Sequence, residues 1–160
     1  MVDIVIADAG ALIALSRVLS LALLADGFGQ IRLTQTVLAE CLARDDRPEG
    51  HAIRLAVDAG WLAVQADVPC VPDWNVGAGE ASAIAAALAL RAGVLIDDRA
   101  GRRLAKSLGL PVIGVLGMLV KAKRLGKVPR LRPLAEQLVA SGYYLSLPVI
   151  EEALQMVGEG

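Results

Sequence analysis

Short apolar runs alternate along the chain with longer stretches in which apolar residues recur at helical spacing. The short runs are bounded by glycine, proline or acidic residues, which is typical of buried strands. The expected strands cover residues 2–7, 31–33, 61–65, 94–96 and 111–113. Because helical stretches separate these strands, the pattern predicts an α/β fold around a parallel sheet.

The helical stretches extend over the whole chain. Helices are expected at residues 11–24, 37–42, 51–59, 80–91, 100–108, 115–125, 134–140 and 148–157. The tripeptide at residues 8–10 would form the turn from the first strand into the first helix, which Gly27 and Gly29 would close. Thr34 or Thr36 would cap the second helix. Loops are expected at residues 45–50 and 67–79.

Composition narrows the kind of core that the chain can form. Its 160 residues are enough for one domain, and 56% of them are hydrophobic, although only 3% are aromatic. The core must therefore consist mainly of Ala, Leu, Val and Ile, which suits helices packed closely on a buried parallel sheet. We expect a single domain over residues 1–160, with residues 128–160 as a C-terminal helical extension.

The sequence also bears on the compartment. Arg17 and Arg91 limit the longest apolar stretches, which stay below the roughly 18–20 residues of a membrane span. Asp3 precedes the first apolar run, which argues against a secretory signal. Cys41 and Cys70 are too few and too far apart to suggest a disulfide framework. We expect a cytoplasmic protein without membrane contact, in which Cys41 is an inert core thiol.

The charge is distributed unevenly, although the net charge is only −1. Residues 1–98 carry 6 basic and 13 acidic side chains, whereas residues 99–132 carry 10 basic and no acidic ones. Residues 133–160 are acidic again. A purely basic stretch next to an acidic half of the chain is an asymmetry that favours a charged partner.

The most informative acids follow the expected strands. Asp8 comes directly after the first strand, and Asp97 and Asp98 come directly after the fourth. Ligands of open parallel sheets bind beyond the carboxyl ends of the strands, so these acids should lie at one edge. Glu40, in the helix after the second strand, and Glu80, in the first turn of the helix before the fourth strand, are expected to join them.

Such a cluster needs a cation, because carboxylates a few ångströms apart repel one another and raise their pKa values. Oxygen ligands suit Mg²⁺ or Mn²⁺, and the absence of a Cys/His set argues against zinc. A bound Mg²⁺ can activate water and stabilise charge on a phosphoryl group.

Each acid also has a purely structural interpretation. Asp8 could cap the first helix, and the Asp97-Asp98 pair could cap the helix that follows it. Glu40 could form a surface ion pair with Arg44, and Glu80 could favour the helix dipole. The common placement of the acids, rather than any one of them, is what favours a metal site.

The basic stretch follows the acidic pair directly. Lys and Arg supply the phosphate contacts that dominate nucleic-acid affinity, and their alternative role is a solvated helix face. The first group contains Arg99, Arg102, Arg103 and Lys106, and the second contains Lys121, Lys123, Arg124, Lys127, Arg130 and Arg132. A metal beside this basic rim suits phosphodiester cleavage, and the scarcity of aromatics limits base recognition by stacking.

Sequence motifs of other enzyme classes do not indicate a function for the chain. Gly77-Ala78-Gly79 lacks the third glycine and the preceding strand of a dinucleotide fingerprint, and there is no Walker A pattern. His51 is the only histidine and lies among polar residues, so it is expected at the surface rather than in a catalytic triad.

Several of these segments resemble PIN domains, especially a VapC-like branch. The likeness spans nearly the whole chain, and its most specific part is the stretch around the acidic pair. It is carried by Asp8-Ala9-Gly10 with Leu12-Ile13-Ala14-Leu15, residues 37–42, Gly60-Trp61, Gly79-Glu80-Ala81, Leu95-Ile96-Asp97-Asp98-Arg99 with Gly101-Arg102-Arg103, and residues 114–126 with Lys121-Ala122-Lys123.

The resemblance implies a three-layer α/β/α sandwich with a central parallel sheet, usually as a homodimer. It also implies Mg²⁺- or Mn²⁺-dependent cleavage of single-stranded RNA, often by a toxin whose cognate antitoxin protein blocks the site. Asp8, Glu40, Glu80 and Asp97 would be the catalytic metal ligands, and Asp98 could take the place of Asp97.

The chain departs from this pattern at two positions. Ala9 replaces the usual hydroxyl residue after the first Asp, and Ser82 stands where the branch often has another acid. The leading hypothesis is a metal-dependent endoribonuclease, and the second is a non-catalytic PIN module that binds RNA or a protein. A phosphoryl-transfer enzyme of a receiver-like or phosphatase-like family is the third, although Asp8 has no adjacent acid.

Overall fold

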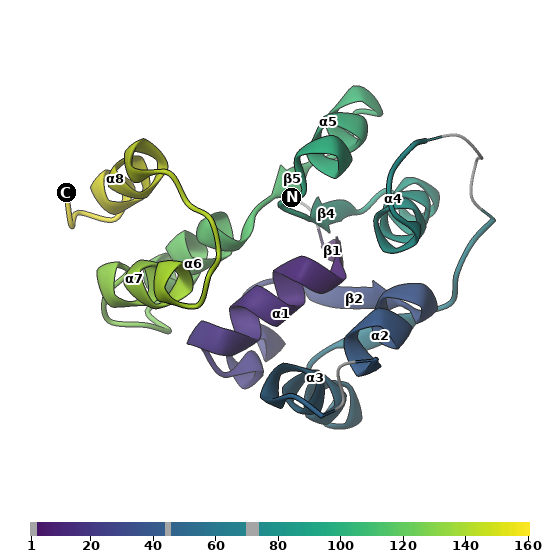
Figure 1. Ribbon diagram of the computed structural model, residues 1–160, viewed down its shortest axis with the longest axis horizontal. Helices are drawn as coiled ribbons and strands as arrows, with labels where there is room; N and C mark the ends of the chain where they lie inside the picture. The colour runs from purple at the N-terminus through teal and green to yellow at the C-terminus, as the bar shows by residue number, and fades with distance from the viewer. Residues whose placement is uncertain (1–2, 44–45, 70–73) are drawn as a thin grey trace.

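A parallel sheet forms the centre of the molecule in the computed structural model, which describes residues 3–43, 46–69 and 74–160. Its strands are β1 (Ile4–Ala7), β2 (Gln30–Thr34), β3 (Ala63–Gln65), β4 (Gly93–Leu95) and β5 (Val112–Ile113), in the order β3-β2-β1-β4-β5 (Figure 1). Every neighbouring pair is parallel, and Val5 of the central strand lies opposite Ile31 and Gly93. The predicted parallel sheet is confirmed, because β1 and β4 are neighbours that run in the same direction.

The helices lie between and after the strands. They are α1 (Ala9–Val18), a 3₁₀ turn η1 (Leu21–Ala25), α2 (Gln35–Leu42), α3 (Pro48–Asp58), α4 (Ala78–Leu90), α5 (Arg99–Ser107), α6 (Val115–Arg124), α7 (Arg132–Ala140) and α8 (Leu147–Met156). Apart from the first and third helices, their ends agree with the expected ones to within about two residues.

The first expected helix, over residues 11–24, is wrong as a single element. Helix α1 ends at Val18, and Leu19 is extended with φ −147°. The hydroxyl of Ser20 then accepts a hydrogen bond from the Ala22 amide and starts the separate turn η1. Apolar spacing continues through this break, but a serine that bonds to nearby backbone gives the chain an alternative to continuing the helix.

The third helix begins earlier than expected. Pro48 occupies its first turn, where the missing proline N–H is no loss, so the described part of the expected loop over residues 45–50 is partly helical. For the second helix, Thr34 is the cap, because its Oγ1 accepts a hydrogen bond of 3.0 Å from the Val37 amide. Thr36 instead bonds to Asp67, both through its amide and through its hydroxyl.

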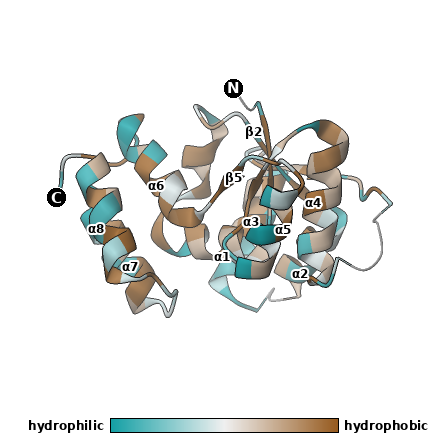
Figure 2. Ribbon diagram, turned by 90° about the horizontal axis from the view of Figure 1, so that it is seen from above, coloured by the Kyte–Doolittle hydropathy of each residue, from teal (hydrophilic) through white to brown (hydrophobic). Residues whose placement is uncertain are grey.

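Alternating residues of the strands face two separate cores. Ile6, Val94 and Ile96 pack with α4 and α5 on one face, whereas Ala7 and Leu95 pack with α1 and α6 on the other. Because side chains alternate along a strand, helices on both faces make the three-layer α/β/α sandwich. Figure 2 shows the polar α5 and the apolar α4 on neighbouring parts of this structure.

The three C-terminal helices belong to the core on the α1 face. Leu131, Leu138 and Leu154 are buried in the same cluster as Leu12 and Leu15 of α1. Figure 1 shows α6, α7 and α8 grouped beyond one end of α1. None of the described helices combines the length and the apolar character that a membrane crossing requires.

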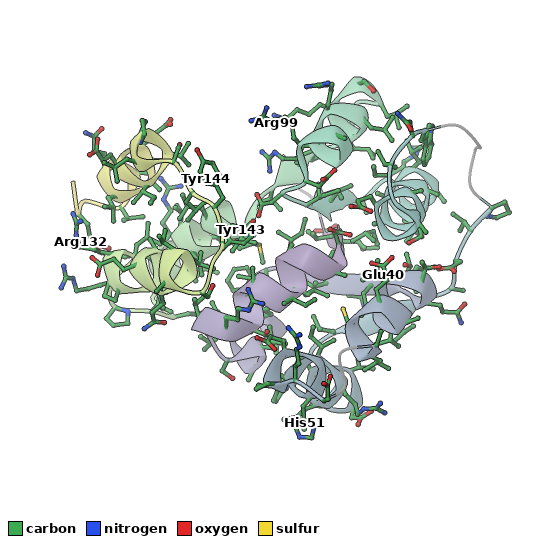
Figure 3. All side chains as sticks on the ribbon, in the orientation of Figure 1. Glu40, His51, Arg99, Arg132, Tyr143 and Tyr144 are labelled. Carbon is green, nitrogen blue, oxygen red and sulfur yellow. The ribbon has the colours of Figure 1, made fainter. Side chains whose placement is uncertain are left out.

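Two single-residue expectations agree with the structure. Cys41 is buried in the core and His51 is exposed on α3 (Figure 3). Cys70 and Arg44 lie outside the described residues. The expected absence of a disulfide and the Glu40–Arg44 ion pair therefore stay predictions.

Candidate active site

The carboxyl edge of the sheet brings acids from four elements to one cavity. Asp8 follows β1, and its amide donates a hydrogen bond of 2.9 Å to the Leu95 carbonyl at the end of β4. This bond places Asp8 near the Asp97-Asp98 pair, as expected. The cavity has a volume of about 540 Å³ and is lined by Asp8, Gly10, Ala11, Glu40, Glu80, Asp97, Asp98, Arg99, Tyr143, Tyr144 and Leu145.

Asp8 is the most perturbed acid of the cavity. Its side chain is buried, with the residue only 7% exposed. Burial raises its pKa from 3.8 to about 6, and the negative charges of Glu80 and Glu40 add to this shift, against the opposing effect of the Ala9 and Gly10 amides. Asp8 precedes α1, yet its side chain makes no capping hydrogen bond. The Ala9 and Gly10 amides of the first turn nevertheless lie close enough to lower its pKa.

Glu40 of α2 lies close to the start of α4. Burial and the charge of Glu80 raise its pKa, and the Gly79 amide lowers it. A Cβ atom on Gly79 would lie 2.6 Å from both carboxylate oxygens of Glu40, which is closer than real Cβ contacts. Glycine at position 79 therefore gives the Glu40 carboxylate room beside the N-terminus of α4.

Glu80 lies in the first turn of α4 and interacts electrostatically with both other acids. Its carboxylate folds back toward Gly77, where a Cβ atom would collide with it. Asp8, Glu40 and Glu80 thus repel one another as a group. This mutual repulsion was expected from their placement and would be relieved by a cation among them.

The two adjacent aspartates have different partners. Asp97 accepts hydrogen bonds from the Val115 amide, at 2.8 Å, and from the Tyr143 hydroxyl. Arg102 lies 3.6 Å from the other oxygen of Asp97 and also donates to the Ile96 carbonyl. Asp98 instead caps α5, because its carboxylate accepts a hydrogen bond of 2.8 Å from the Gly101 amide.

Tyr143 is a residue of the cavity that sequence reasoning missed. Burial and the hydrogen bond to Asp97 raise the pKa of its hydroxyl, and the charges of Asp97 and Asp8 add to the shift. The hydroxyl therefore stays protonated and donates to Asp97. The only available signal was that Tyr143 and Tyr144, the two tyrosines of the chain, are adjacent and lie between two expected helices.

A chain of buried hydroxyls connects the elements that carry Glu40 and Glu80. Ser82 donates a hydrogen bond of 2.8 Å to the Gly79 carbonyl, so Thr34 must donate the 2.7 Å bond between the two hydroxyls. Thr34 in turn caps α2 through the Val37 amide. Ser82 therefore fixes α4 against the end of β2.

The first basic group lies beside the acidic cavity. Arg99 lines the cavity itself and comes from α5 on the side opposite Tyr143 and Tyr144 (Figure 3). A neighbouring hollow of about 400 Å³ is lined by Asp97, Arg99, Arg102, Arg103 and Lys106. These cations are therefore placed to attract a polyanion toward the acids.

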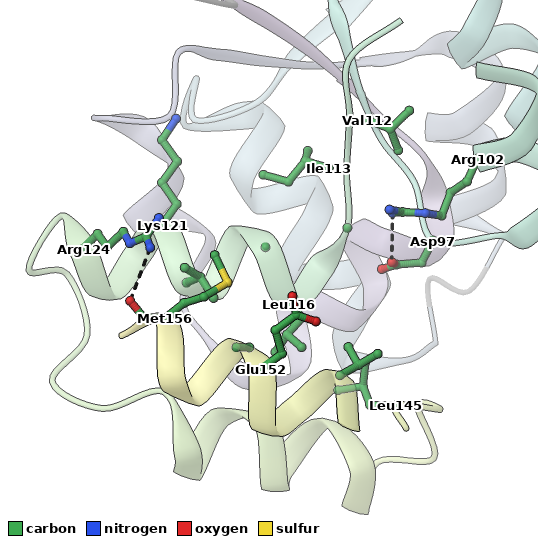
Figure 4. Close-up of a pocket in the computed structure, with 15 residues that line it drawn as sticks. Asp97, Arg102, Val112, Ile113, Leu116, Lys121, Arg124, Leu145, Glu152 and Met156 are labelled. Atoms are coloured by element: carbon green, nitrogen blue, oxygen red, sulfur yellow. Dashed lines mark hydrogen bonds and ion pairs between the residues drawn. The ribbon is translucent and has the colours of Figure 1, made fainter. Parts of the chain in front are cut away.

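The second basic group is divided by its contacts. Lys121 and Arg124 line a third cavity of about 840 Å³, which reaches Asp97 and Arg102 and has a largely aliphatic wall (Figure 4). Lys121 also lies 5.6 Å from the centre of the Phe28 ring, and Arg124 donates to the Met156 carbonyl. Lys123 instead forms an ion pair of 2.7 Å with Glu159 and does not line these cavities.

Glu159 also contacts other members of the second basic group. The Arg130 guanidinium lies 3.8 Å from its carboxylate, and the amides of Leu131 and Arg132 donate to it at 2.6 and 3.1 Å. This Glu159 site connects the end of the chain after α8 to α6 and the start of α7.

The donor set suits a divalent cation, although it is not gathered tightly. Within residues 3–43, 46–69 and 74–160, no three His, Cys, Asp or Glu side chains are close enough to hold one ion as they stand. The acids around the cavity nevertheless offer only oxygen atoms, and burial, together with neighbouring negative charge, raises the pKa values of Asp8 and Glu40. The residues fit Mg²⁺ or Mn²⁺ in ligand type and in electrostatics.

A parallel α/β/α sandwich with acids at the carboxyl ends of β1 and β4 agrees with the architecture of a PIN-like protein. A family model for the PIN domain matches residues 4–159, and the chain belongs to this family. PIN domains are generally nucleases that use divalent metals.

The fold is also found in a solved structure. The chain is similar to a PilT N-terminus domain protein from the hyperthermophilic archaeon Sulfolobus solfataricus P2, with a TM-score of 0.54 and 19% sequence identity. The alignment covers 89% of this chain and 97% of the archaeal protein. No curated protein matches the chain in sequence.

Proposed function

We propose that this PIN-domain protein is an Mg²⁺- or Mn²⁺-dependent endoribonuclease that cleaves single-stranded RNA. The observation that carries the proposal is the electrostatic state of the cavity. Burial and the negative charge of Glu80 raise the pKa values of Asp8 and Glu40, and a fourth acid, Asp97, lines the same space. Repulsion of this kind among acids favours a cation-binding site, because ionisable groups with strongly perturbed pKa values in a cavity are characteristic of functional sites.

The proposed ligands are Asp8, Glu40, Glu80 and one member of the Asp97-Asp98 pair. A divalent cation, when bound, supplies an activated water and stabilises charge on the phosphoryl group. The chain's own residues do the remaining work. Asp8 must release its proton, and Tyr143 holds the Asp97 carboxylate in one orientation.

The basic side chains would bind the phosphates of the RNA. We assign this role to Arg99, Arg102, Arg103 and Lys106, which line the hollow next to the acids, and to Lys121 and Arg124 in the third cavity. Lys123 was expected in this group, but its ion pair with Glu159 makes it a weaker candidate. Phosphate contacts of this kind supply sequence-independent affinity.

The biological role that we propose is that of a VapC-like toxin, which acts as a homodimer and is inhibited by a cognate antitoxin. The support is the likeness of the motifs around Asp8 and the Asp97-Asp98 pair to that branch. We further propose one domain over residues 1–160, with residues 128–160 as its helical extension.

The second candidate function is a non-catalytic PIN module that binds RNA or a protein. Ala9 and Ser82 favour it, since Ala9 has no hydroxyl and the hydroxyl of Ser82 is used within the fold. Titration calorimetry with Mn²⁺ separates the candidates, because a non-catalytic cavity should bind no metal. The phosphoryl-transfer alternative is set aside, because the chain belongs to the PIN-domain family.

Cleavage of a fluorescently labelled single-stranded RNA tests the proposed function. The wild-type protein should cleave it with Mn²⁺ or Mg²⁺ and not with a chelator present. Asp8→Asn should lower the rate by about 100-fold or more, as removal of a group that stabilises the transition state does. Asp58→Asn, which changes an exposed acid on α3, is the matched control and should cleave normally. Equal cleavage by Asp8→Asn would overturn the mechanism.

A further inference from the structure

Tyr144 is a strongly exposed aromatic residue beside the acidic cavity. Its residue is 85% exposed, although it lines the acidic cavity. The other aromatic residues within the described ranges are buried or packed against a core: Phe28, Trp61, Trp74 and Tyr143. Leaving an aromatic ring in water gives up the stabilisation that its burial would provide.

The neighbours of Tyr144 hold its backbone at the mouth of the cavity. On one side, the Tyr143 hydroxyl donates to Asp97. On the other, Leu145 packs against the main core. Because both neighbours are anchored, Tyr144 is positioned by the fold rather than placed at the free tip of a long loop.

A cation faces Tyr144 across the same cavity. Arg99 is exposed, comes from α5 and lines the cavity together with Tyr144 (Figure 3). An aromatic face and a guanidinium beside an acidic floor match the parts of a nucleotide, because the base stacks and the phosphate pairs with Arg. Stacking on aromatic side chains is the usual means by which proteins bind unpaired bases.

We propose that Tyr144 is a base-stacking residue for single-stranded RNA, which holds the nucleotide next to the cleaved phosphate while Arg99 contacts the backbone. The proposal rests on the proposed function, in that RNA must reach the acidic cavity. Since every base has a π face, this contact selects unpaired RNA over duplex RNA and tolerates all four bases.

Fluorescence anisotropy with a labelled ten-residue oligoadenylate tests the proposal, with Ca²⁺ in place of Mn²⁺ so that a cation is present while hydrolysis is slow. Tyr144→Ala should weaken binding by about 5- to 150-fold, the range expected for one stacked base. Tyr144→Phe keeps the ring and should stay within about 2-fold of the wild type. Leu147→Ala is the matched control, because it removes a 69% exposed side chain from the nearby start of α8 without touching the cavity.

A second probe separates stacking from other roles of the tyrosine. In a series of decamers, each oligonucleotide has one abasic ribose, and the abasic site is moved along the strand. At one position the wild type should lose affinity, and Tyr144→Ala should show no further loss. Equal weakening of Tyr144→Ala for every decamer, including that one, would show that Tyr144 does not contact a base.

Three further outcomes would contradict the proposed stacking role of Tyr144. Unchanged affinity of Tyr144→Ala overturns the proposal, and if the wild type still cleaves RNA, the proposed function stands without it. A change of oligomeric state in Tyr144→Ala, seen by size-exclusion chromatography at unchanged RNA affinity, would assign the residue to a protein interface instead. A wild type that binds no oligonucleotide overturns both proposals.

Discussion

Two carboxylates of this chain, Asp8 and Glu159, have opposite electrostatic surroundings. Asp8 is buried beside other acids, and its pKa rises to about 6. Glu159 accepts hydrogen bonds from the Lys123 ammonium and from the Leu131 and Arg132 amides, which hold its pKa at about 2. The fold thus places an ammonium and two amides around the Glu159 carboxylate, whereas the charged groups that shift the pKa of Asp8 are two other acids, Glu80 and Glu40.

The difference shows how to separate a structural acid from a functional one. The Glu159 side chain is only 8% exposed, although the residue as a whole is half-buried, so low side-chain exposure does not by itself identify a functional acid. The two acids differ in burial, which is the largest cause of the raised pKa of Asp8, and in whether the chain provides a compensating charge, as Lys123 does for Glu159. Glu159, with its lysine and amide partners, stabilises the fold, whereas the mutually repelling Asp8, Glu40 and Glu80 carboxylates are available to bind a cation from solution.

The largest effect is expected from the adjacent aspartates of the cavity. Asp97→Asn should lower RNA cleavage by about 100-fold, because it alters both a proposed ligand and the acceptor of the Tyr143 hydroxyl. Asp98→Asn should stay within about 3-fold, because asparagine caps helices as well as aspartate does. Steady-state kinetics on the labelled RNA gives both rates. The reverse order would make Asp98 the ligand.

Next in size is the effect of Asp8 on stability. The pKa of Asp8 is 3.8 in the exposed state and about 6 in the fold, so between these pH values the folded protein holds a proton that the unfolded chain has released. Stability is therefore lost as the pH rises through this window. Without metal, Asp8→Asn should raise the free energy of unfolding at pH 7 by about 2 to 3 kcal/mol.

Urea denaturation with a chelator present measures this gain. Below about pH 4 the gain should vanish, because Asp8 is then protonated in both states of the wild type. Glu40, whose pKa is also raised, changes stability in the same direction and is left intact in the comparison. A variant less stable than the wild type at pH 7 would contradict the assignment of Asp8 as an uncompensated charge.

A smaller effect is expected from Tyr143, whose hydroxyl donates a hydrogen bond to Asp97, one of the proposed metal ligands of the cavity. Tyr143→Phe removes only the hydroxyl and should lower kcat by about 10-fold, as loss of a hydrogen bond to a metal ligand does. The KM for RNA should change little, which separates orientation of Asp97 from RNA binding. An unchanged kcat would mean that the Val115 amide alone orients Asp97.

The smallest effect should come from Glu159→Gln. Its pKa of about 2 lies below the ordinary 4.5, so Glu159 stabilises the fold above pH 4.5 and loses this contribution as the pH falls toward 2. The variant should unfold at slightly lower temperature at pH 7, with the difference shrinking in acid, because solvent and salt weaken such ion pairs. RNA cleavage should not change. A loss of cleavage would connect the Glu159 site to the active site.

The sequence predicted the sheet because its strands are short apolar runs with polar ends. The run before Asp8 and the run before Asp97 are typical of buried strands, and parallel strands bring their carboxyl ends to one edge. The same local signals failed at Ser20, where one side-chain hydrogen bond breaks a stretch whose apolar spacing continues. The spacing of apolar residues indicates which face of a helix is buried, but it does not indicate where the backbone changes direction.

The sequence by itself therefore determined the α/β class and the acids that follow the strands, since both depend on residues close together in the chain. Only the tertiary structure decided that Lys123 pairs with Glu159, that Tyr143 donates to Asp97 and that Tyr144 stands exposed at the cavity. Lys123 and Glu159 are 36 positions apart, and Asp97 and Tyr143 are 46 positions apart. Packing of α7 and α8 on the core is what brings these groups together, and no local pattern encodes it.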